Sequence, residues 1–207
     1  MPWQSTADFI ADSKGVVDLT QQAPVAGSYT GVEPMGLIWS QVPEIEGERE
    51  VFAESALEPI ETRIEAEIAG QVIRATLVQR LAAAGVQRVE VREQGLVGTL
   101  YLPATPGPHP AVVILNGSGG GINEPRAALY ASHGYLAFAL AYFKAPGLSD
   151  YISNTPLEYF KKGLDWLRQK YQPLNNFVAL NGQSRGGELV LLLASIYPED
   201  VSAVVAY

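Results

Sequence analysis

The chain has 207 residues, a mass of 22.3 kDa and 47% hydrophobic residues, enough for one full domain or one and a half small ones. Its formal net charge of -8 and pI near 4.8 provide no basic stripe for a phosphate backbone, which argues against nucleic-acid binding. Cysteine is absent, and this excludes disulfides, thiolate metal ligands and a cysteine nucleophile.

Residues 1–80 predict an all-β module made of hairpins. Phe9 and Ile10 lead into Asp12-Ser13-Lys14-Gly15, whose composition favours a tight reversal, and residues 16–19 lead out of it. Apolar and charged residues alternate over 62–68 and again over 72–80, around a turn expected at Gly70-Gln71. Two hairpins are therefore expected in this module.

The segments between these hairpins predict connections. Residues 21–43 are rich in Pro and Gly and indicate a loop with short extended segments, packed down by the apolar cluster at 35–39. The acidic stretch 44–61 indicates a solvated connector. Residues 81–85, Leu-Ala-Ala-Ala-Gly, are expected to link the module to a second domain at 86–207.

The second domain starts with strands and continues as an alternation of strands and helices. Residues 86–92 and 96–102 predict a third hairpin across Glu93-Gln94-Gly95, at the edge of a new sheet. Continuous apolar runs predict buried strands at 111–115, 136–141, 177–180 and 201–206. Helices are expected at 124–133, 156–170 and 188–196. Because they alternate with the predicted strands, a mostly parallel sheet with flanking helices is expected, which is an α/β fold.

The segment Gly182-Gln183-Ser184-Arg185-Gly186 fits the GxSxG pattern of a nucleophile elbow. A serine on a sharp strand-to-helix turn projects its hydroxyl above the sheet, and the flanking glycines let the backbone pass close without a Cβ clash. The apolar runs before and after the motif provide the strand and the helix that it requires. Ser184 is therefore the predicted nucleophile, and the alternative is a glycine-rich turn with an inert serine.

The glycine-rich segment Asn116-Gly117-Ser118-Gly119-Gly120-Gly121 follows the first buried strand. In an acyl-transfer site, oxyanion donors come from such a loop and from the residue after the nucleophile. The expected donors are the backbone N–H groups of Arg185, Gly117, Ser118 and Gly119. A phosphate cradle is the rival interpretation, but the loop lacks the Lys-Ser/Thr ending of a P-loop and the GxGxxG spacing.

The catalytic base is missing from this pattern. The chain has two histidines, His109 and His133, and both precede Ser184, whereas the acid and histidine of an α/β-hydrolase triad follow the serine. Both histidines, and the acids Glu199 and Asp200, are expected to be structural or solvent-facing. No metal site is expected.

Five segments, in order along almost the whole chain, resemble the acyl-CoA thioesterase / bile acid-CoA:amino acid N-acyltransferase family. They are GVVDLTQQAPVAGSYTGVEPMGLIWS, HPAVVILNGSGGG, ALYASHGYLAFALAYF, PLEYF at 156–160 and GQSRGGELVLLLAS. The resemblance implies an N-terminal β-sandwich joined to a C-terminal α/β-hydrolase domain, both partial here. It also implies a Ser or Cys nucleophile with Asp and His, of which only the nucleophile can be carried over, to Ser184.

The function implied by this resemblance is hydrolysis of acyl-CoA thioesters through a serine acyl-enzyme. Coenzyme A would be part of the substrate, and no cofactor is expected. Three alternatives stay open: amino acid conjugation by an N-acyltransferase, a dienelactone-hydrolase-like esterase, and an inactive acyl-CoA-binding fragment. A serine ester suits hydrolysis better than transfer to an amine, which favours the thioesterase.

Two further expectations concern partners and location. No signal-peptide pattern or apolar run of about 18 residues is present, so a cytoplasmic protein without a membrane span is expected. If the sheet ends at residues 201–207, Val201, Val204, Val205 and Tyr207 form an apolar edge. Such an edge favours self-association.

Overall fold

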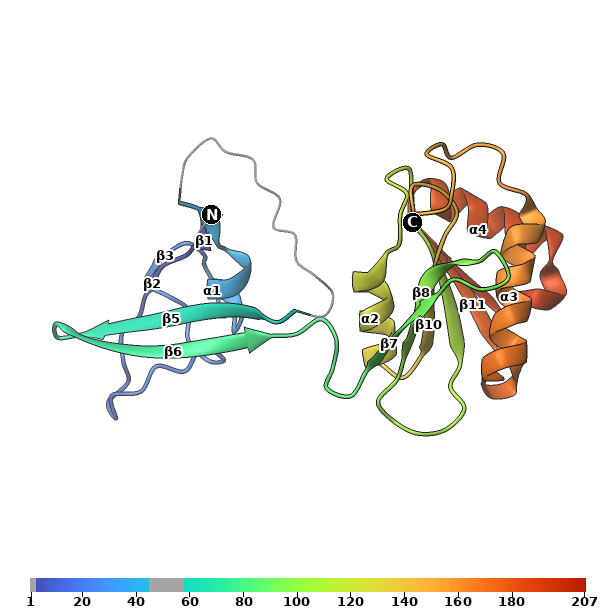
Figure 1. Ribbon diagram of the computed structural model, residues 1–207. Helices are drawn as coiled ribbons and strands as arrows, with labels where there is room; N and C mark the ends of the chain where they lie inside the picture. Colours follow the sequence, from blue (N-terminus) through green and yellow to red (C-terminus); the bar gives the residue numbers. More distant parts are fainter. Residues whose placement is uncertain (1–2, 45–57) are drawn as a thin grey trace. The chain divides into compact units, whose positions relative to one another are not determined.

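The computed structural model describes residues 3–44 and 58–207, which form two compact units (Figure 1). The first unit comprises residues 3–44 and 62–77, and the second comprises residues 58–61 and 78–207. Most of the acidic connector expected at 44–61 lies outside the described residues. None of the helices within the two described ranges has the length and apolar character needed to cross a bilayer.

The first unit contains short antiparallel pairs and one long hairpin. β1 (Trp3–Gln4) pairs with β4 (Val42–Pro43), and β2 (Ala7–Asp8) pairs with β3 (Ala26–Gly27). β5 (Ile60–Ile68) and β6 (Gln71–Gln79) form the two-stranded sheet expected near 62–80. Its turn is Ala69-Gly70, one residue before the predicted position, and both residues have positive φ angles, of 50° and 77°.

The hairpin expected around Asp12 is wrong, although its turn is present. The Asp12 carboxylate accepts the N–H groups of Lys14 and Val16, and Gly15 donates to the Asp12 carbonyl. The residues on either side of this turn do not form a pair of strands, because β2 pairs with β3 instead. The loop at 21–43 also contains a short helix, α1 (Gly36–Trp39), whose Gly36 packs against the Tyr29 ring.

The second unit has a six-stranded sheet in the order β12-β11-β9-β10-β8-β7. The strands are β7 (Gln87–Val91), β8 (Val97–Leu102), β9 (Ala111–Leu115), β10 (Leu136–Ala141), β11 (Val178–Gly182) and β12 (Ala203–Ala206). β9 to β12 are joined by parallel pairings, whereas β8 is antiparallel to β7 and β10. The mostly parallel sheet and its edge hairpin were both predicted from the sequence.

Helices cover both faces of this sheet. The helices are α2 (Glu124–Ser132), α3 (Leu157–Tyr171) and α4 (Arg185–Ile196), with short 3₁₀ turns at Leu174–Asn176 and Pro198–Asp200. Along β9, Val113 and Leu115 join the core under α3 and α4, while Val112 and Ile114 pack against the alanines of α2. This alternation follows the period of two in a strand and explains the fully buried run at 111–115.

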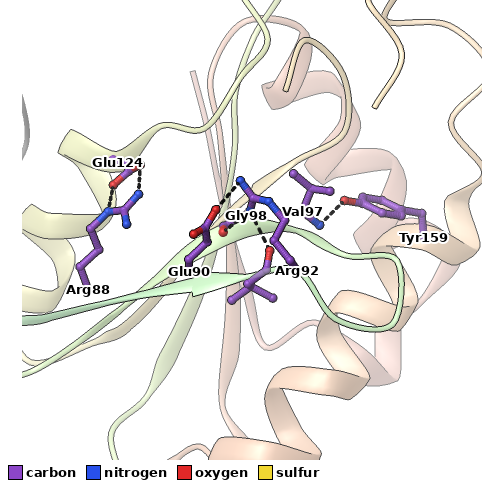
Figure 2. Close-up of polar contacts among 8 residues, drawn as sticks. Arg88, Glu90, Arg92, Val97, Gly98, Glu124 and Tyr159 are labelled. Atoms are coloured by element: carbon purple, nitrogen blue, oxygen red, sulfur yellow. Dashed lines mark hydrogen bonds and ion pairs between the residues drawn. The ribbon is translucent and has the colours of Figure 1, made fainter. Parts of the chain in front are cut away.

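Polar contacts attach the edge hairpin to the helices (Figure 2). Arg88 on β7 forms a bidentate pair with Glu124 at the start of α2, with N···O distances of 2.6 and 2.7 Å. Arg92 pairs with Glu90 and donates to the carbonyls of Val91 and Gly98. The Tyr159 hydroxyl of α3 accepts the Val97 N–H and donates to the Ala141 carbonyl.

Candidate active site

Ser184 lies between the end of β11 and the start of α4, with φ 54° and ψ -122°. Residues with a Cβ rarely adopt this backbone region, and holding one there costs about 1–3 kcal/mol. The side chain is exposed. A strained, exposed serine at a strand-to-helix corner is the arrangement that the GxSxG pattern predicts.

The two glycines of the motif are required by close backbone approaches. A Cβ built on Gly182 would lie 2.0 Å from the Gly186 carbonyl oxygen, and one built on Gly186 would lie 2.4 Å from the Leu115 carbonyl oxygen. Neither distance is compatible with a side chain. The helix therefore starts directly after Ser184, at Arg185 rather than at the predicted Glu188.

Hydrogen bonds hold the Ser184 backbone on both sides. Its N–H donates to the Tyr207 carbonyl at 2.7 Å, and its carbonyl accepts the N–H of Gly187 at 2.8 Å. Arg126 on α2 donates to the side chain of Gln183 at 3.0 Å, and its guanidinium lies 4.8 Å from the centre of the Tyr207 ring. Arg126 therefore contacts both Gln183 of the elbow and the residue that follows β12.

The glycine loop after β9 lies against the elbow. A Cβ on Gly117 would be 3.0 Å from the Ser184 Cβ and 2.9 Å from the Gln183 carbonyl oxygen. The loop is braced by Asn116, whose side chain accepts the Gly117 N–H at 3.0 Å and donates to the Gly120 carbonyl at 2.7 Å. Ser118 and Gly119 are exposed at the tip of the loop.

Tyr142 fixes the loop from the other side. Its hydroxyl donates to the Asn116 carbonyl at 2.8 Å, and burial raises the pKa of this phenol above its ordinary value. The hydroxyl therefore keeps its proton across the neutral range. Tyr142 follows β10, so three neighbouring strands meet at this point of the sheet edge.

Arg185, the first residue of α4, has two distinct groups at the site. Its backbone N–H belongs to the first turn of the helix, where N–H groups lack acceptors in a preceding turn. Its guanidinium pairs with Glu188 at 2.6 Å, and both side chains are exposed. The guanidinium thus contacts a carboxylate on its own helix, one turn further along.

Neither histidine lies near Ser184. His109 precedes β9, and His133 caps the end of α2 ahead of β10, so both lie at the edge where the parallel strands begin. Ser184 follows the end of β11, at the opposite edge, about 16 Å away along a five-residue strand. His109 contacts the Thr105 carbonyl and His133 the Leu129 carbonyl, at 2.8 Å each.

Asp200 has a structural contact that the sequence did not indicate. Its carboxylate lies 3.3 Å from Arg168 and 3.3 Å from Lys161, both on α3. These pairs join α3 to the turn before β12. The contact agrees with a structural role rather than a catalytic one.

A pocket of about 240 Å³ opens beside the elbow helix. Four residues of α4, namely Arg185, Glu188, Leu189 and Leu192, line one wall. Tyr142 and Phe160 contribute to the rest of the lining. The pocket therefore begins at the residue next to the serine and is bounded by the tyrosine that holds the glycine loop.

Comparison with known families identifies the chain. The family described as acyl-CoA thioester hydrolase/BAAT N-terminal region matches residues 1–93, and BAAT / acyl-CoA thioester hydrolase C terminal matches residues 155–207. The chain belongs to the acyl-CoA thioester hydrolase/BAAT family. The resemblance seen in the sequence is thereby confirmed. The mostly parallel sheet with helices on both faces agrees with the α/β fold expected for the second unit.

Curated relatives of this family align along almost the whole chain. Acyl-coenzyme A thioesterase 1 of Rattus norvegicus is 35% identical over 98% of this chain and 50% of that protein. The mitochondrial acyl-coenzyme A thioesterase 2 of Rattus norvegicus is 36% identical over 98% of this chain and 46% of that protein. The chain spans about half the length of the curated relatives it matches.

Solved structures resemble part of the chain. Dienelactone hydrolase from Anabaena variabilis superposes with a TM-score of 0.48, at 24% identity, over 59% of this chain and 63% of that one. EstE1, a thermophilic carboxylesterase cloned from a metagenomic library, superposes with a TM-score of 0.47, at 21% identity, over 59% of this chain and 46% of that one.

Sequence reasoning missed three residues at the site: Arg126, Tyr142 and Tyr207. Each acts through contacts between segments that are distant in sequence, and none lies in a motif with a recognisable spacing. For Tyr142 and Tyr207 the sequence offered one signal, which is that each directly follows a predicted strand. For Arg126 it offered none.

Proposed function

We propose that this family member hydrolyses acyl-CoA thioesters through Ser184. The observation that carries the proposal is the backbone of Ser184, held at φ 54° and ψ -122° with its side chain exposed and the glycine loop against it. Family membership supports the substrate class, since the curated relatives are named acyl-coenzyme A thioesterases. No cofactor is needed for this chemistry.

In the proposed reaction, the Ser184 hydroxyl attacks the thioester carbonyl carbon and loses its proton to a base. The C–S bond then breaks, coenzyme A leaves as the thiol after taking up a proton, and the acyl group stays on the serine as an ester. Water attacks this ester, releasing the carboxylic acid and restoring the hydroxyl. Each addition step places negative charge on the former carbonyl oxygen.

Backbone N–H groups would stabilise this oxyanion. The Arg185 N–H at the start of α4 is one proposed donor, and the helix dipole adds to its effect. The second donor would come from the glycine loop. Because Gly117 already donates to its neighbour Asn116, Ser118 or Gly119 at the exposed tip is the better candidate among the three predicted residues.

The base is the group that these residues do not provide. The chain's two histidines, His109 and His133, lie at the opposite edge of the sheet, so the proposed reaction would take its histidine base from outside this chain. Removing the histidine of a triad can lower turnover on the order of 10⁶-fold. We therefore expect negligible acyl-CoA hydrolysis by this polypeptide alone.

Chemical rescue tests the proposal directly. Added imidazole can replace a missing base, so imidazole should raise CoA release from decanoyl-CoA by the wild-type chain at least about tenfold over Ser184→Ala. The Ser184→Ala chain measures the direct reaction of imidazole with the thioester. Equal rates for the two folded proteins would refute a nucleophilic Ser184.

Conjugation to an amino acid is the second candidate, because the family includes BAAT. The same rescue reaction with glycine or taurine present separates the two, as an amide product would replace the free acid. Dominance of the free acid is expected from a serine ester. An inactive acyl-CoA-binding protein would show saturable binding without any Ser184-dependent release.

A general esterase is the third candidate, and the wild-type and Ser184→Ala proteins test it as well. A dienelactone-hydrolase-like enzyme would cleave a p-nitrophenyl ester in preference to an acyl-CoA under rescue. A cytoplasmic location stays a prediction, since relatives of nearly equal identity include proteins named mitochondrial.

A further inference from the structure

The pocket beside α4 has a wall formed by one stripe of the elbow helix. Arg185, Glu188, Leu189 and Leu192 occupy positions i, i+3, i+4 and i+7, which lie on one side of an α-helix. The adjacent stripe, Gly186, Gly187, Val190 and Leu193, is buried against the sheet. The pocket wall therefore runs from the residue after Ser184 along the helix for about 10 Å, at 1.5 Å per residue.

The opposite wall comes from the segment after β10 and from α3. Ile152 and Phe160 add apolar surface there, and Tyr142 joins this wall to the glycine loop through its bond to Asn116. A group bound in the pocket would thus lie between the helix that begins at the nucleophile and residues of the segment 142–160. A pocket that begins next to Ser184 is placed to hold one arm of a substrate that this serine attacks.

The chemistry of the lining indicates which part of the substrate, the acyl chain or coenzyme A, the pocket would hold. Ile152, Phe160, Leu189 and Leu192 are apolar, and the Arg185 charge is balanced by Glu188 at 2.6 Å. A carboxylate in the lining and no unbalanced cation disfavour the phosphates of coenzyme A. The volume of about 240 Å³ is below the range of about 300–1,000 Å³ typical of pockets for whole small molecules.

We propose that this pocket binds the acyl tail of the thioester, as an aliphatic chain laid along α4, and limits its length. The inference rests on the proposed function, because it takes the reacting carbonyl to lie at Ser184. Coenzyme A would leave the site on the other side of the serine. Chains that extend beyond Leu192 would emerge into solvent, since Leu192 and Ile152 are 47% and 43% exposed.

Photo-crosslinking tests the placement without requiring turnover. The probe is decanoyl-CoA with a diazirine at the far end of its chain, irradiated with the full 207-residue protein and digested with trypsin. Crosslinks should concentrate in the peptides covering residues 145–161 and 186–207, which contain Ile152, Leu189 and Leu192. Crosslinks spread over the whole chain, or concentrated elsewhere, would overturn the assignment.

Matched variants test the pocket itself. Leu192→Trp should fill it and lower crosslinking to residues 145–161 by about tenfold, equivalent to about 1.4 kcal/mol of binding. Leu191→Trp, at a 57% exposed neighbour on α4 outside the lining, should leave it unchanged. Ile152→Trp fills the same space from the opposite wall and should act like Leu192→Trp. Equal crosslinking in all three variants would exclude this pocket.

Imidazole-rescued CoA release, measured on the same proteins, separates this inference from the proposed function. Ser184-dependent CoA release with crosslinks outside the pocket would refute acyl-chain binding in this pocket but would leave the proposed thioesterase function in place. Pocket crosslinks sensitive to Leu192→Trp, without Ser184-dependent release, would support the acyl site and refute the hydrolytic role of Ser184.

Discussion

The backbone N–H of Ser184 donates to the carbonyl of Tyr207 at 2.7 Å, so the elbow is joined to the residue that follows β12. The Tyr207 N–H donates in turn to the carbonyl of Gly182, the last residue of β11, at 3.2 Å, which extends the β11–β12 pairing past the end of β12. The neighbouring strand therefore helps to hold Ser184 in a conformation that its Cβ disfavours.

The first prediction concerns this strain. Ser184→Gly should raise the free energy of unfolding by about 1 kcal/mol, because glycine adopts φ 54° and ψ -122° without a Cβ penalty. The greater chain entropy of unfolded glycine offsets part of the gain. Ser184→Ala keeps the Cβ and should stay within about 0.5 kcal/mol of wild type. Urea unfolding measures both, and equal stabilities for the two variants would contradict a strained elbow.

The second prediction concerns Arg126 and Gln183, whose side chains are 3.0 Å apart. In a double-mutant cycle of Arg126→Met and Gln183→Ala, the effects on the free energy of unfolding should be coupled by about 0.5–3 kcal/mol. Arg126→Met combined with Glu90→Gln should be additive, since Glu90 pairs with Arg92 instead. Additive effects in the first cycle would show that Arg126 does not stabilise the elbow through Gln183.

The third prediction uses the contrast between two glycines of the loop. Gly117→Ala places a Cβ 2.9 Å from the Gln183 carbonyl oxygen and should lower the free energy of unfolding by about 1–3 kcal/mol. Gly119→Ala meets no atom within 4 Å and should be nearly neutral. Denaturant unfolding compares them. Similar losses in both variants would mean that the loop does not lie against the serine as described.

The sequence predicted the second unit well because its signals are local. Fully apolar runs specified β9 and β10, and the stripe containing Phe160, Leu164 and Leu167 specified α3. The glycines at 182 and 186, between a strand signal and a helix signal, specified the elbow, because its close backbone approaches leave no room for a Cβ at either position. Periodicity and glycine positions reflect packing within one element, which the sequence alone can report.

The sequence failed where pairing is decided between distant segments. Asp12 makes the turn that its composition predicts, yet Ala7–Asp8 pairs with Ala26–Gly27 rather than across that turn. The contacts of Arg126 with Gln183 and Tyr207 likewise join segments far apart in the chain. No local pattern encodes such contacts, because they depend on which segments the finished fold brings together.

The fourth prediction concerns pH and the pair that holds the edge hairpin (Figure 2). Arg88, with a further hydrogen bond from Tyr101, keeps the pKa of the Glu124 carboxyl below its ordinary value of 4.5. A carboxyl with a lowered folded-state pKa adds stability that is present above pH 4.5 and is lost as the pH falls through the folded value.

Glu124→Gln should therefore lower the free energy of unfolding by about 1 kcal/mol at pH 7 and reduce the loss of this free energy as the pH falls below 4.5. Glu90→Gln removes an exposed partner of Arg92 and should cost less than about 0.5 kcal/mol. Urea unfolding at several pH values measures this difference. Identical pH profiles for wild type and Glu124→Gln would show that this pair does not contribute.

The fifth prediction concerns the two edges of the sheet in the second unit. β7 carries Arg88 and Glu90, and Arg92 directly follows it; charges of this kind discourage pairing with another strand. β12 is the other outer strand in the described sheet, and its residues Ala203–Ala206 carry no charge. Val205 is 48% exposed, and Tyr207 beyond the strand is 58% exposed.

We expect the 207-residue chain to self-associate through β12, as the apolar edge at 201–207 predicts. Sedimentation analysis should show a concentration-dependent dimer, which Val205→Lys should shift toward the monomer by placing a charge on the strand. Val32→Lys adds the same charge at an exposed residue of the first unit and should leave the dimer in place. If the wild-type chain stays monomeric at all concentrations, or both lysine variants weaken the dimer equally, β12 is not the surface through which copies associate.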